Sequence, residues 1–129
     1  MKVVKFGGSS VANADQISKV VEIVRADLDR KIVVVSAPGK RHRDDTKVTD
    51  LLITLARRVL EGEAYEHSLE QVVDRYGEIQ RELGLSDDVL DEVREDLENR
   101  IANRGSHEAQ FMDTMKAAGE DNNAKVIAA

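Results

Sequence analysis

Residues 3–12 of the chain, Val-Val-Lys-Phe-Gly-Gly-Ser-Ser-Val-Ala, join a short apolar segment directly to two glycines and two serines. A second apolar segment occupies residues 31–37. Both segments are rich in Val or Ile and are bounded by Gly, Ser or Pro, which is typical of parallel strands buried on both faces. We therefore expect strands at Val3–Phe6 and Lys31–Ala37, with their carboxyl ends at one edge of a sheet.

The segment between these strands has helical periodicity. Its apolar residues recur at intervals of three and four, namely Ile17, Val20, Val21, Val24 and Leu28. Asn13 or Asp15 can cap the start of this helix. A strand, a helix and a second parallel strand form a βαβ unit with a right-handed crossover, so the expected fold class is α/β.

After a loop at residues 38–46, the periodicity is helical to the end of the chain. We expect helical stretches that contain residues 48–59, 69–83, 86–101, 111–119 and 120–129. Gly84 and Gly105 should end the second and third stretches, and Ser86 should cap the third. We interpret Gly119 as a hinge between the last two.

The composition limits the kinds of site that the chain can contain. It has 129 residues, 19 Lys and Arg against 25 Asp and Glu, a formal net charge of −6 and no Cys. One domain or part of one is expected, without disulfides, thiolate metal sites or thiol nucleophiles. His42, His67 and His107 are far apart in the sequence, so we expect no metal site.

Neither nucleic acid nor a membrane is an expected partner. The net charge is acidic and the only aromatic residues are two Tyr and two Phe, whereas nucleic-acid binding favours basic surfaces and stacking side chains. The longest run of Val and Ile, Ile32–Val35, is far shorter than the roughly 20 apolar residues that span a bilayer. We expect a soluble, cytoplasmic protein.

Two strands do not form a stable sheet by themselves, because each leaves an unpaired edge. We therefore expect further strands, either from residues beyond Ala129 or from another copy of the chain. The lack of a stop signal at the end of the last helix favours the first explanation. No repeat, low-complexity tract or polar linker divides residues 1–129.

The turn after the first strand is the strongest candidate for binding chemistry. Gly7, Gly8, Ser9 and Ser10 follow the carboxyl end of that strand, where ligands bind in open α/β sheets. Adjacent glycines let N–H groups converge on an anion, and Lys5 adds a positive charge for phosphate oxygens. The segment matches neither the Walker A pattern nor the G-x-G-x-x-G fingerprint. The alternative is an ordinary tight turn beside a surface lysine.

Three further residues could contribute to the same site. Ser36 ends the neighbouring strand and is expected to face the same crevice as Gly8. Thr49 begins a helix, where it either caps that helix or binds a carboxylate. Glu120 is expected in the acidic first turn of the last helix, where it either complements the helix dipole or holds an ammonium group. The charged loop at residues 41–47 is either solvated or a lid over an anionic ligand.

Taken together, four motifs resemble the amino-terminal half of the aspartokinases, which belong to the amino acid kinase superfamily. They are residues 5–12 (Lys-Phe-Gly-Gly-Ser-Ser-Val-Ala), 34–37 (Val-Val-Ser-Ala), 48–52 (Val-Thr-Asp-Leu-Leu) and 119–125 (Gly-Glu-Asp-Asn-Asn-Ala-Lys). The resemblance covers residues 1–129. It implies that ATP with Mg²⁺ donates its γ-phosphoryl group to the β-carboxylate of L-aspartate, which gives 4-phospho-L-aspartate for lysine, threonine and methionine synthesis.

The resemblance also implies roles for single residues. Lys5 would neutralise charge on the transferring phosphoryl group, and the turn from Gly7 to Ser10 would cradle phosphate oxygens. Ser36, Thr49 and Glu120 would hold aspartate, with Glu120 facing its ammonium group.

The sequence also departs from the family pattern. Asn123 stands where many relatives have Ser, although an amide there can still hydrogen-bond. The family's nucleotide-binding half and regulatory domains have no counterpart in residues 1–129, so we expect the amino-acid-substrate side of a kinase site that is inactive alone.

Two alternative functions stay open. One is a kinase for another small acid, such as glutamate or acetylglutamate. The other is a non-catalytic interaction module that uses the acidic helix after Ser86. Association into a homo-oligomer would cover the strand edges.

Overall fold

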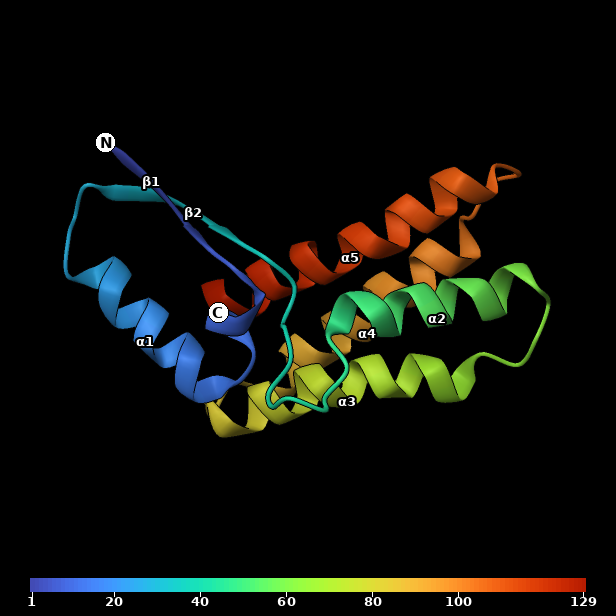
Figure 1. Cartoon of the computed structure of the whole chain (residues 1–129), viewed down its shortest axis with the longest axis horizontal. Coiled ribbons are helices and arrows are strands. Elements are labelled where there is room, and N and C mark those ends of the chain that lie inside the picture. The colour runs from blue at the N-terminus through green and yellow to red at the C-terminus, as the bar shows by residue number, and fades with distance from the viewer.

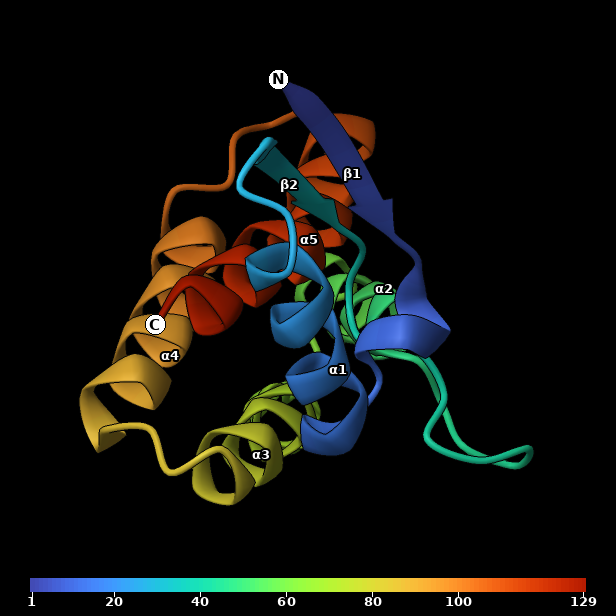
Figure 2. The ribbon, with the colours of Figure 1, turned by 90° about the vertical axis from the view of Figure 1, so that its left-hand side faces the viewer.

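The computed structural model describes residues 1–129 without a gap (Figure 1). Its elements are β1 (Lys2–Phe6), the 3₁₀ turn η1 (Gly8–Val11), α1 (Ala14–Arg25), β2 (Arg30–Val35), α2 (Val48–Leu60), α3 (Glu66–Glu82), α4 (Asp87–Ala102) and α5 (Glu108–Ala128). The strands and α1 form a small α/β unit, and α2 to α5 form a helical bundle beside it (Figures 1 and 2). The predicted α/β class, with two parallel strands followed by a helix-rich segment, is confirmed.

The α/β unit has the connectivity expected from the sequence. β1 and β2 pair in parallel, with Phe6 opposite Val35 at their carboxyl ends. Asn13 caps α1, because its side-chain oxygen accepts a hydrogen bond from the Gln16 N–H. The strand ends and the start of α1 are therefore held at one end of the unit.

The turn between α1 and β2 begins earlier than the apolar pattern predicts. α1 ends at Arg25, so Leu28, which we expected on the helix, lies in the turn and is 82% exposed. The Asp27 carboxylate accepts the Asp29 N–H at 2.9 Å. This local hydrogen bond competes with continuation of the helix.

The two strands are not buried on both faces, contrary to the expectation from their composition. Val3 is 62% exposed, and Ile32 and Val34 are each 45% exposed. An apolar cleft of about 320 Å³ separates β2 from α1 and from the end of α5. The Val and Ile content shows that the strands are suited to burial. Within residues 1–129 they are buried only in part, because burial depends on what covers the strands.

The main hydrophobic core lies among the bundle helices and extends to α1 and η1. Its most deeply buried side chains include Val11, Ile17, Leu52, Leu55, Val72, Tyr76, Ile79, Val93, Leu97 and Met115. These residues belong to one continuous cluster, so the α/β unit is packed on the bundle.

The helix ends in the bundle follow the predicted signals. Gly84, which ends α3, has a φ of 69°, and the Ser86 side chain caps α4 by accepting the Asp88 N–H. None of the helices combines the length and the apolar character that a membrane span requires.

α5 is one continuous helix through Gly119, so the predicted hinge between two shorter helices is wrong. A Cβ at Gly119 would lie 2.7 Å from the Cβ of Ala37 and 3.1 Å from Cδ1 of Leu52. The glycine therefore permits close packing of α5 against the end of β2 and against α2. The buried Tyr76 hydroxyl donates to the Gly119 carbonyl at 2.8 Å, and its burial raises the pKa of the phenol.

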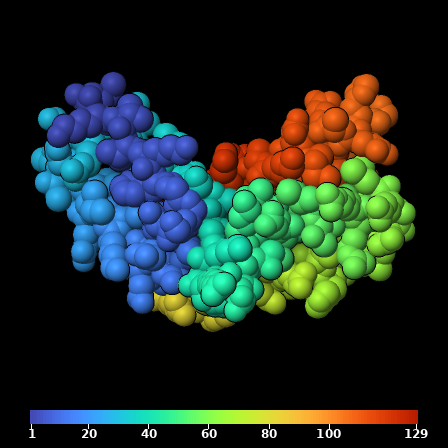
Figure 3. Space-filling model, in the orientation of Figure 1, coloured from blue at the N-terminus to red at the C-terminus, as the bar shows by residue number.

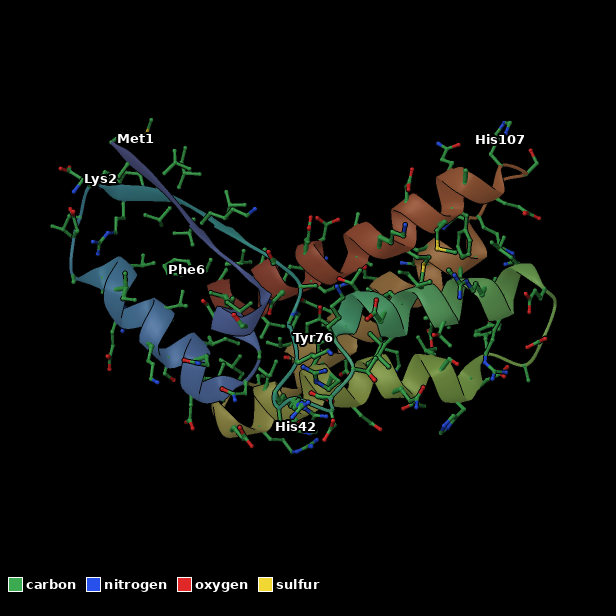
Figure 4. All side chains as sticks on the ribbon, in the orientation of Figure 1. Met1, Lys2, Phe6, His42, Tyr76 and His107 are labelled. Carbon is green, nitrogen blue, oxygen red and sulfur yellow. The ribbon has the colours of Figure 1, made fainter.

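The surface is hollowed along the upper edge, between the α/β unit and the far end of the bundle (Figure 3). The C-terminal half of α5 lies at the base of this hollow. Met1 and Lys2 lie at the tip of one side and His107 at the tip of the other (Figure 4). The strand ends and α5 therefore meet near the middle of the molecule.

We expect Gly119→Ala to destabilise the protein. Overpacking of a tight contact typically costs about 1–3 kcal/mol, which outweighs the roughly 0.5–1 kcal/mol that alanine gains over glycine inside a helix. Denaturant unfolding followed by circular dichroism would measure the net loss. Gly105→Ala is the matched control, because a Cβ there meets no atom within 4 Å. A Gly119→Ala variant as stable as the wild type would show that α5 can move away from β2 without cost.

Candidate functional site

The segments that follow β1 and β2 meet through backbone contacts. The Ser36 N–H donates to the Phe6 carbonyl at 3.0 Å, and the Gly39 N–H donates to the Gly8 carbonyl at 2.9 Å. A Cβ on Gly39 would lie only 2.6–2.9 Å from backbone atoms of Gly8 and Ser9. No side chain fits at position 39, and Gly8 and Ser36 lie at the same edge, as parallel pairing predicts.

The turn from Gly7 to Ser10 presents free backbone donors. Gly7 precedes η1, and the Ser10 N–H donates to the Gly7 carbonyl at 3.1 Å. The N–H groups of Gly8 and Ser9 donate no hydrogen bond, and a Cβ on Gly7 would meet no atom within 4 Å. An anion can approach these donors closely, so the residues fit a phosphate group.

Lys5 lies on β1 opposite Val34 and is exposed, and its side chain makes no hydrogen bond or ion pair. By contrast, Lys2 on the same strand pairs with Asp27 at 2.5 Å. The charge of Lys5 is therefore not committed to an interaction within the fold.

Ser36 is connected to α5 through Asn123. The side-chain Nδ2 of Asn123 donates to the Ser36 carbonyl at 2.7 Å, which confirms that an amide at this position can hydrogen-bond. Asn123 is 0% exposed, and its Oδ1 has no hydrogen-bond partner. One buried acceptor therefore remains unpaired beside Ser36.

Thr49 does not cap α2, because Lys47 occupies the cap position and no side chain accepts a first-turn N–H. The Val48 N–H donates to the Pro38 carbonyl at 3.0 Å, which places the start of α2 beside the segment that follows β2. The N–H of Asp50 donates to the Lys47 carbonyl, but the N–H of Thr49 donates to none. The first turn of α2 therefore retains a free donor at Thr49, next to its hydroxyl.

Glu120 lies in the middle of α5 and not in a first helical turn, so the helix-dipole explanation does not apply. It is exposed and forms no ion pair. The preceding Gly119 packs on Ala37, and Asn123, one turn later, binds Ser36. Because residues three apart share one side of a helix, Glu120 lies beside the end of β2.

Residues 41–47, which we expected to be solvated or lid-like, are tied to α3. The Arg41 guanidinium binds Asp45 through Nε at 2.7 Å and Nη2 at 2.9 Å, and its Nη1 lies 2.6 Å from the Glu78 carboxylate. Hydrogen bonds from Arg41 hold the pKa of Asp45 well below its ordinary value. The loop is exposed in part but anchored.

Arg75 of α3 is a buried polar residue that the sequence analysis did not identify. It is 5% exposed and lies 3.6 Å from the Asp45 carboxylate. Its burial lowers the pKa of the guanidinium. The available signal was its spacing, because it stands three residues after Val72 and four before Ile79 and so shares their buried face.

The chain contains no group of three or more His, Cys, Asp or Glu residues placed to hold a metal ion. His42 and His107 lie in separate regions of the structure (Figure 4). Protein side chains alone therefore do not form a metal site in residues 1–129.

We expect Asp45→Asn to lower the free energy of unfolding at pH 7, because Arg41 and Arg75 lose their carboxylate partner. The folded-state pKa of Asp45 lies below its ordinary value of 3.8. Its contribution is therefore fully present above about pH 5 and is lost as the pH falls through the folded-state pKa.

Urea unfolding at several pH values would measure this effect, and the difference between wild type and variant should shrink below about pH 4. Asp44→Asn, which changes a neighbouring loop carboxylate without an ion pair, is the control. A difference that is independent of pH would show that Asp45 acts by packing and not by charge.

Comparison with known proteins assigns the chain to a family. Residues 1–129 match the model of the amino acid kinase family. Aspartokinase 3 of Bacillus subtilis (strain 168) is 50% identical over 129 residues, which are 100% of this chain and 28% of that protein. The chain therefore spans less than a third of this relative.

Two solved structures have the same arrangement. The crystal structure of Clostridium acetobutylicum aspartate kinase matches with a TM-score of 0.81 and 34% identity, over 98% of this chain and 28% of the other. E. coli aspartokinase III in complex with aspartate and ADP matches with a TM-score of 0.74 and 27% identity, over 97% and 27% of the respective chains. The resemblance to aspartokinases is confirmed, and the chain belongs to the amino acid kinase family.

Proposed function

We propose that residues 1–129 form the amino-acid-substrate side of an ATP-dependent aspartokinase. The reaction transfers the γ-phosphoryl group of ATP to the β-carboxylate of L-aspartate and gives 4-phospho-L-aspartate and ADP. One observation supports this proposal above the others: the donor-rich turn at Gly7–Ser10 is hydrogen-bonded to the segment after β2, and the start of α2 and the middle of α5 contact the same segment through Val48, Gly119 and Asn123.

The proposed residues suit phosphoryl transfer, which needs alignment and positive charge more than covalent help from the protein. The free N–H groups of Gly8 and Ser9 would bind phosphate oxygens, and Lys5 would offset the negative charge that accumulates during transfer. When bound, ATP supplies the phosphoryl group.

The acceptor would be held from three elements. The free N–H and hydroxyl of Thr49, at the positive end of α2, suit a carboxylate of aspartate. Glu120, exposed and unpaired, suits its ammonium group. Ser36 would contribute from the end of β2, where Asn123 hydrogen-bonds to its carbonyl.

The two alternative functions have less support. The named relatives are aspartokinases, and a solved one contains aspartate. In the acidic helix α4, Arg94 pairs with Glu70 of α3, and Arg100 pairs with Asp96 and with Asp121 of α5. These ion pairs account for part of the helix's charge without an external partner. A role in lysine and threonine synthesis, action in the cytoplasm, a requirement for Mg²⁺ and a homo-oligomeric state stay predictions.

We expect the full-length gene product that contains residues 1–129 to phosphorylate aspartate. A coupled assay of ADP release, with the acyl phosphate trapped by hydroxylamine, would measure turnover on aspartate, glutamate and acetylglutamate. Turnover on another acid but not on aspartate would contradict the proposal. Residues 1–129 expressed alone should show no measurable turnover, because nothing in them encloses a nucleotide.

We expect Lys5→Ala in the full-length product to reduce kcat by about 100-fold or more, since loss of one positioned electrostatic group in a site typically has that effect. Stability should not change, because Lys5 makes no contact that the fold needs. Lys2→Ala, on the same strand, removes the ion pair with Asp27 and is the matched control. Near-normal turnover in Lys5→Ala would show that Lys5 is only a surface residue of β1.

We expect Glu120→Gln to raise the KM for aspartate by about 10- to 100-fold, because a hydrogen bond between charged groups contributes roughly 1.5–3 kcal/mol. The KM for ATP should change little. Asp121→Asn is the control, since this adjacent carboxylate is already paired with Arg100. An equal rise in both KM values would place Glu120 outside the aspartate pocket.

A further inference from the structure

Arg75 connects two segments of the site that are far apart in the sequence. Its Nη1 donates to the Thr46 carbonyl at 2.7 Å, and its Nη2 donates to the Gly39 carbonyl at 2.8 Å and the Ala12 carbonyl at 3.4 Å. Gly39 and Thr46 lie in the loop between β2 and α2, and Ala12 ends the turn after β1. One guanidinium therefore holds both segments against α3.

The three carbonyls lie next to the residues of the proposed site. Ala12 lies two residues after the phosphate turn (Gly7–Ser10), and the Gly39 N–H donates to the Gly8 carbonyl in that turn. Thr46 precedes the first turn of α2, which carries Thr49. A shift of Arg75 would therefore move the phosphate-binding and aspartate-binding segments relative to each other.

The chemistry of position 75 favours a positioning role over simple packing. A buried cation requires desolvation, and an apolar side chain of similar volume is often as stable or more stable at such a place. Only Arg offers a rigid, planar set of five donors that can bind several carbonyls at once. Asp45, 3.6 Å away, supplies the compensating charge.

We propose that Arg75 is a positioning residue that holds the phosphate turn and the loop between β2 and α2 in the alignment needed for phosphoryl transfer. This inference rests on the proposed function, because it assigns the two segments to phosphate and aspartate. Arg75 itself touches neither substrate.

Arg75→Met in the full-length product removes the donors but keeps an unbranched side chain. We expect kcat per folded molecule to fall by at least about 30-fold, while the KM values for aspartate and ATP change by less than about threefold, because misalignment affects the transfer step most. Arg75→Lys should recover only part of the lost activity, since one ammonium group cannot reproduce the planar set of donors of a guanidinium.

Two controls separate alignment from stability. Val72→Ala removes buried apolar volume on the same face of α3, without a polar contact to either segment. Arg94→Met removes a half-buried Arg that binds Glu70 across α3 and α4. If either control reduces kcat per folded molecule as much as Arg75→Met does, the role of Arg75 is only structural.

Chemical rescue provides a more direct test. An open cavity of about 300 Å³, lined by Arg41, Asp45, Arg75 and Glu78 among others, gives access to the guanidinium position. Added methylguanidinium should therefore raise the kcat of Arg75→Ala and leave that of Val72→Ala unchanged. Failure of rescue at concentrations that stabilise Arg75→Ala against heat would overturn the proposal.

Hydrogen exchange tests the connection without any assay of activity. In Arg75→Met, the amides of residues 8–12 and of residues 39–47 should lose protection together, while those of α4 keep theirs. Loosening of one segment alone, or of the whole chain equally, would overturn the proposal. If the wild-type protein does not phosphorylate aspartate, the proposed function fails, and this exchange pattern alone then decides whether Arg75 connects the two segments.

Discussion

The close approach of Gly39 to Gly8 and Ser9 is the contact on which the arrangement of the site depends. Parallel pairing brings the ends of β1 and β2 to one edge, but the chain then leaves each strand in a different direction. Only a position without a Cβ lets the two departing backbones lie within hydrogen-bond distance. The turn with free N–H groups and the loop that leads to α2 consequently become neighbours. Arg75 of α3 then holds both segments by hydrogen bonds to their carbonyls.

The helical bundle meets the same point from the other side. α5 packs at Gly119 against Ala37 and Leu52, and Asn123 hydrogen-bonds to the Ser36 carbonyl one turn later. These two contacts fix both the distance and the rotation of α5 relative to β2. The helices therefore do more than cover the α/β unit, because α5 brings Glu120, which follows Gly119, close to the strand end.

The sequence was sufficient for features that depend on local physics. The Val- and Ile-rich segments, the helical spacing of apolar residues, the Asn13 and Ser86 caps and the Gly84 terminator predicted the elements and the parallel pair, because each signal lies within a few residues of its effect. The sequence-based prediction was wrong where a feature depends on residues that are distant in the chain. Gly119 resembles a hinge until Ala37 is placed against it, and the exposed strands resemble buried ones because composition does not show what covers them.

Arg75 could not be assigned from the sequence for the same reason. Its acceptors are backbone carbonyls as many as 63 residues away, and any residue type supplies such a carbonyl. The residue types at positions 5, 36, 49 and 120 carried chemical information of their own, whereas the groups that hold them in place did not.

The charged residues around the strand ends are of two kinds: those paired within the fold and those left without a partner. Arg41 and Arg75 face Asp45, and Arg41 also reaches Glu78, so these charges are balanced within the fold. Lys5 and Glu120 have no such partners and are solvated. A charge already balanced inside the protein has little to offer a ligand. An exposed, unpaired charge can exchange water for a phosphate oxygen or an ammonium group when a ligand binds. The paired groups can therefore keep the segments fixed while the unpaired ones interact with the substrates.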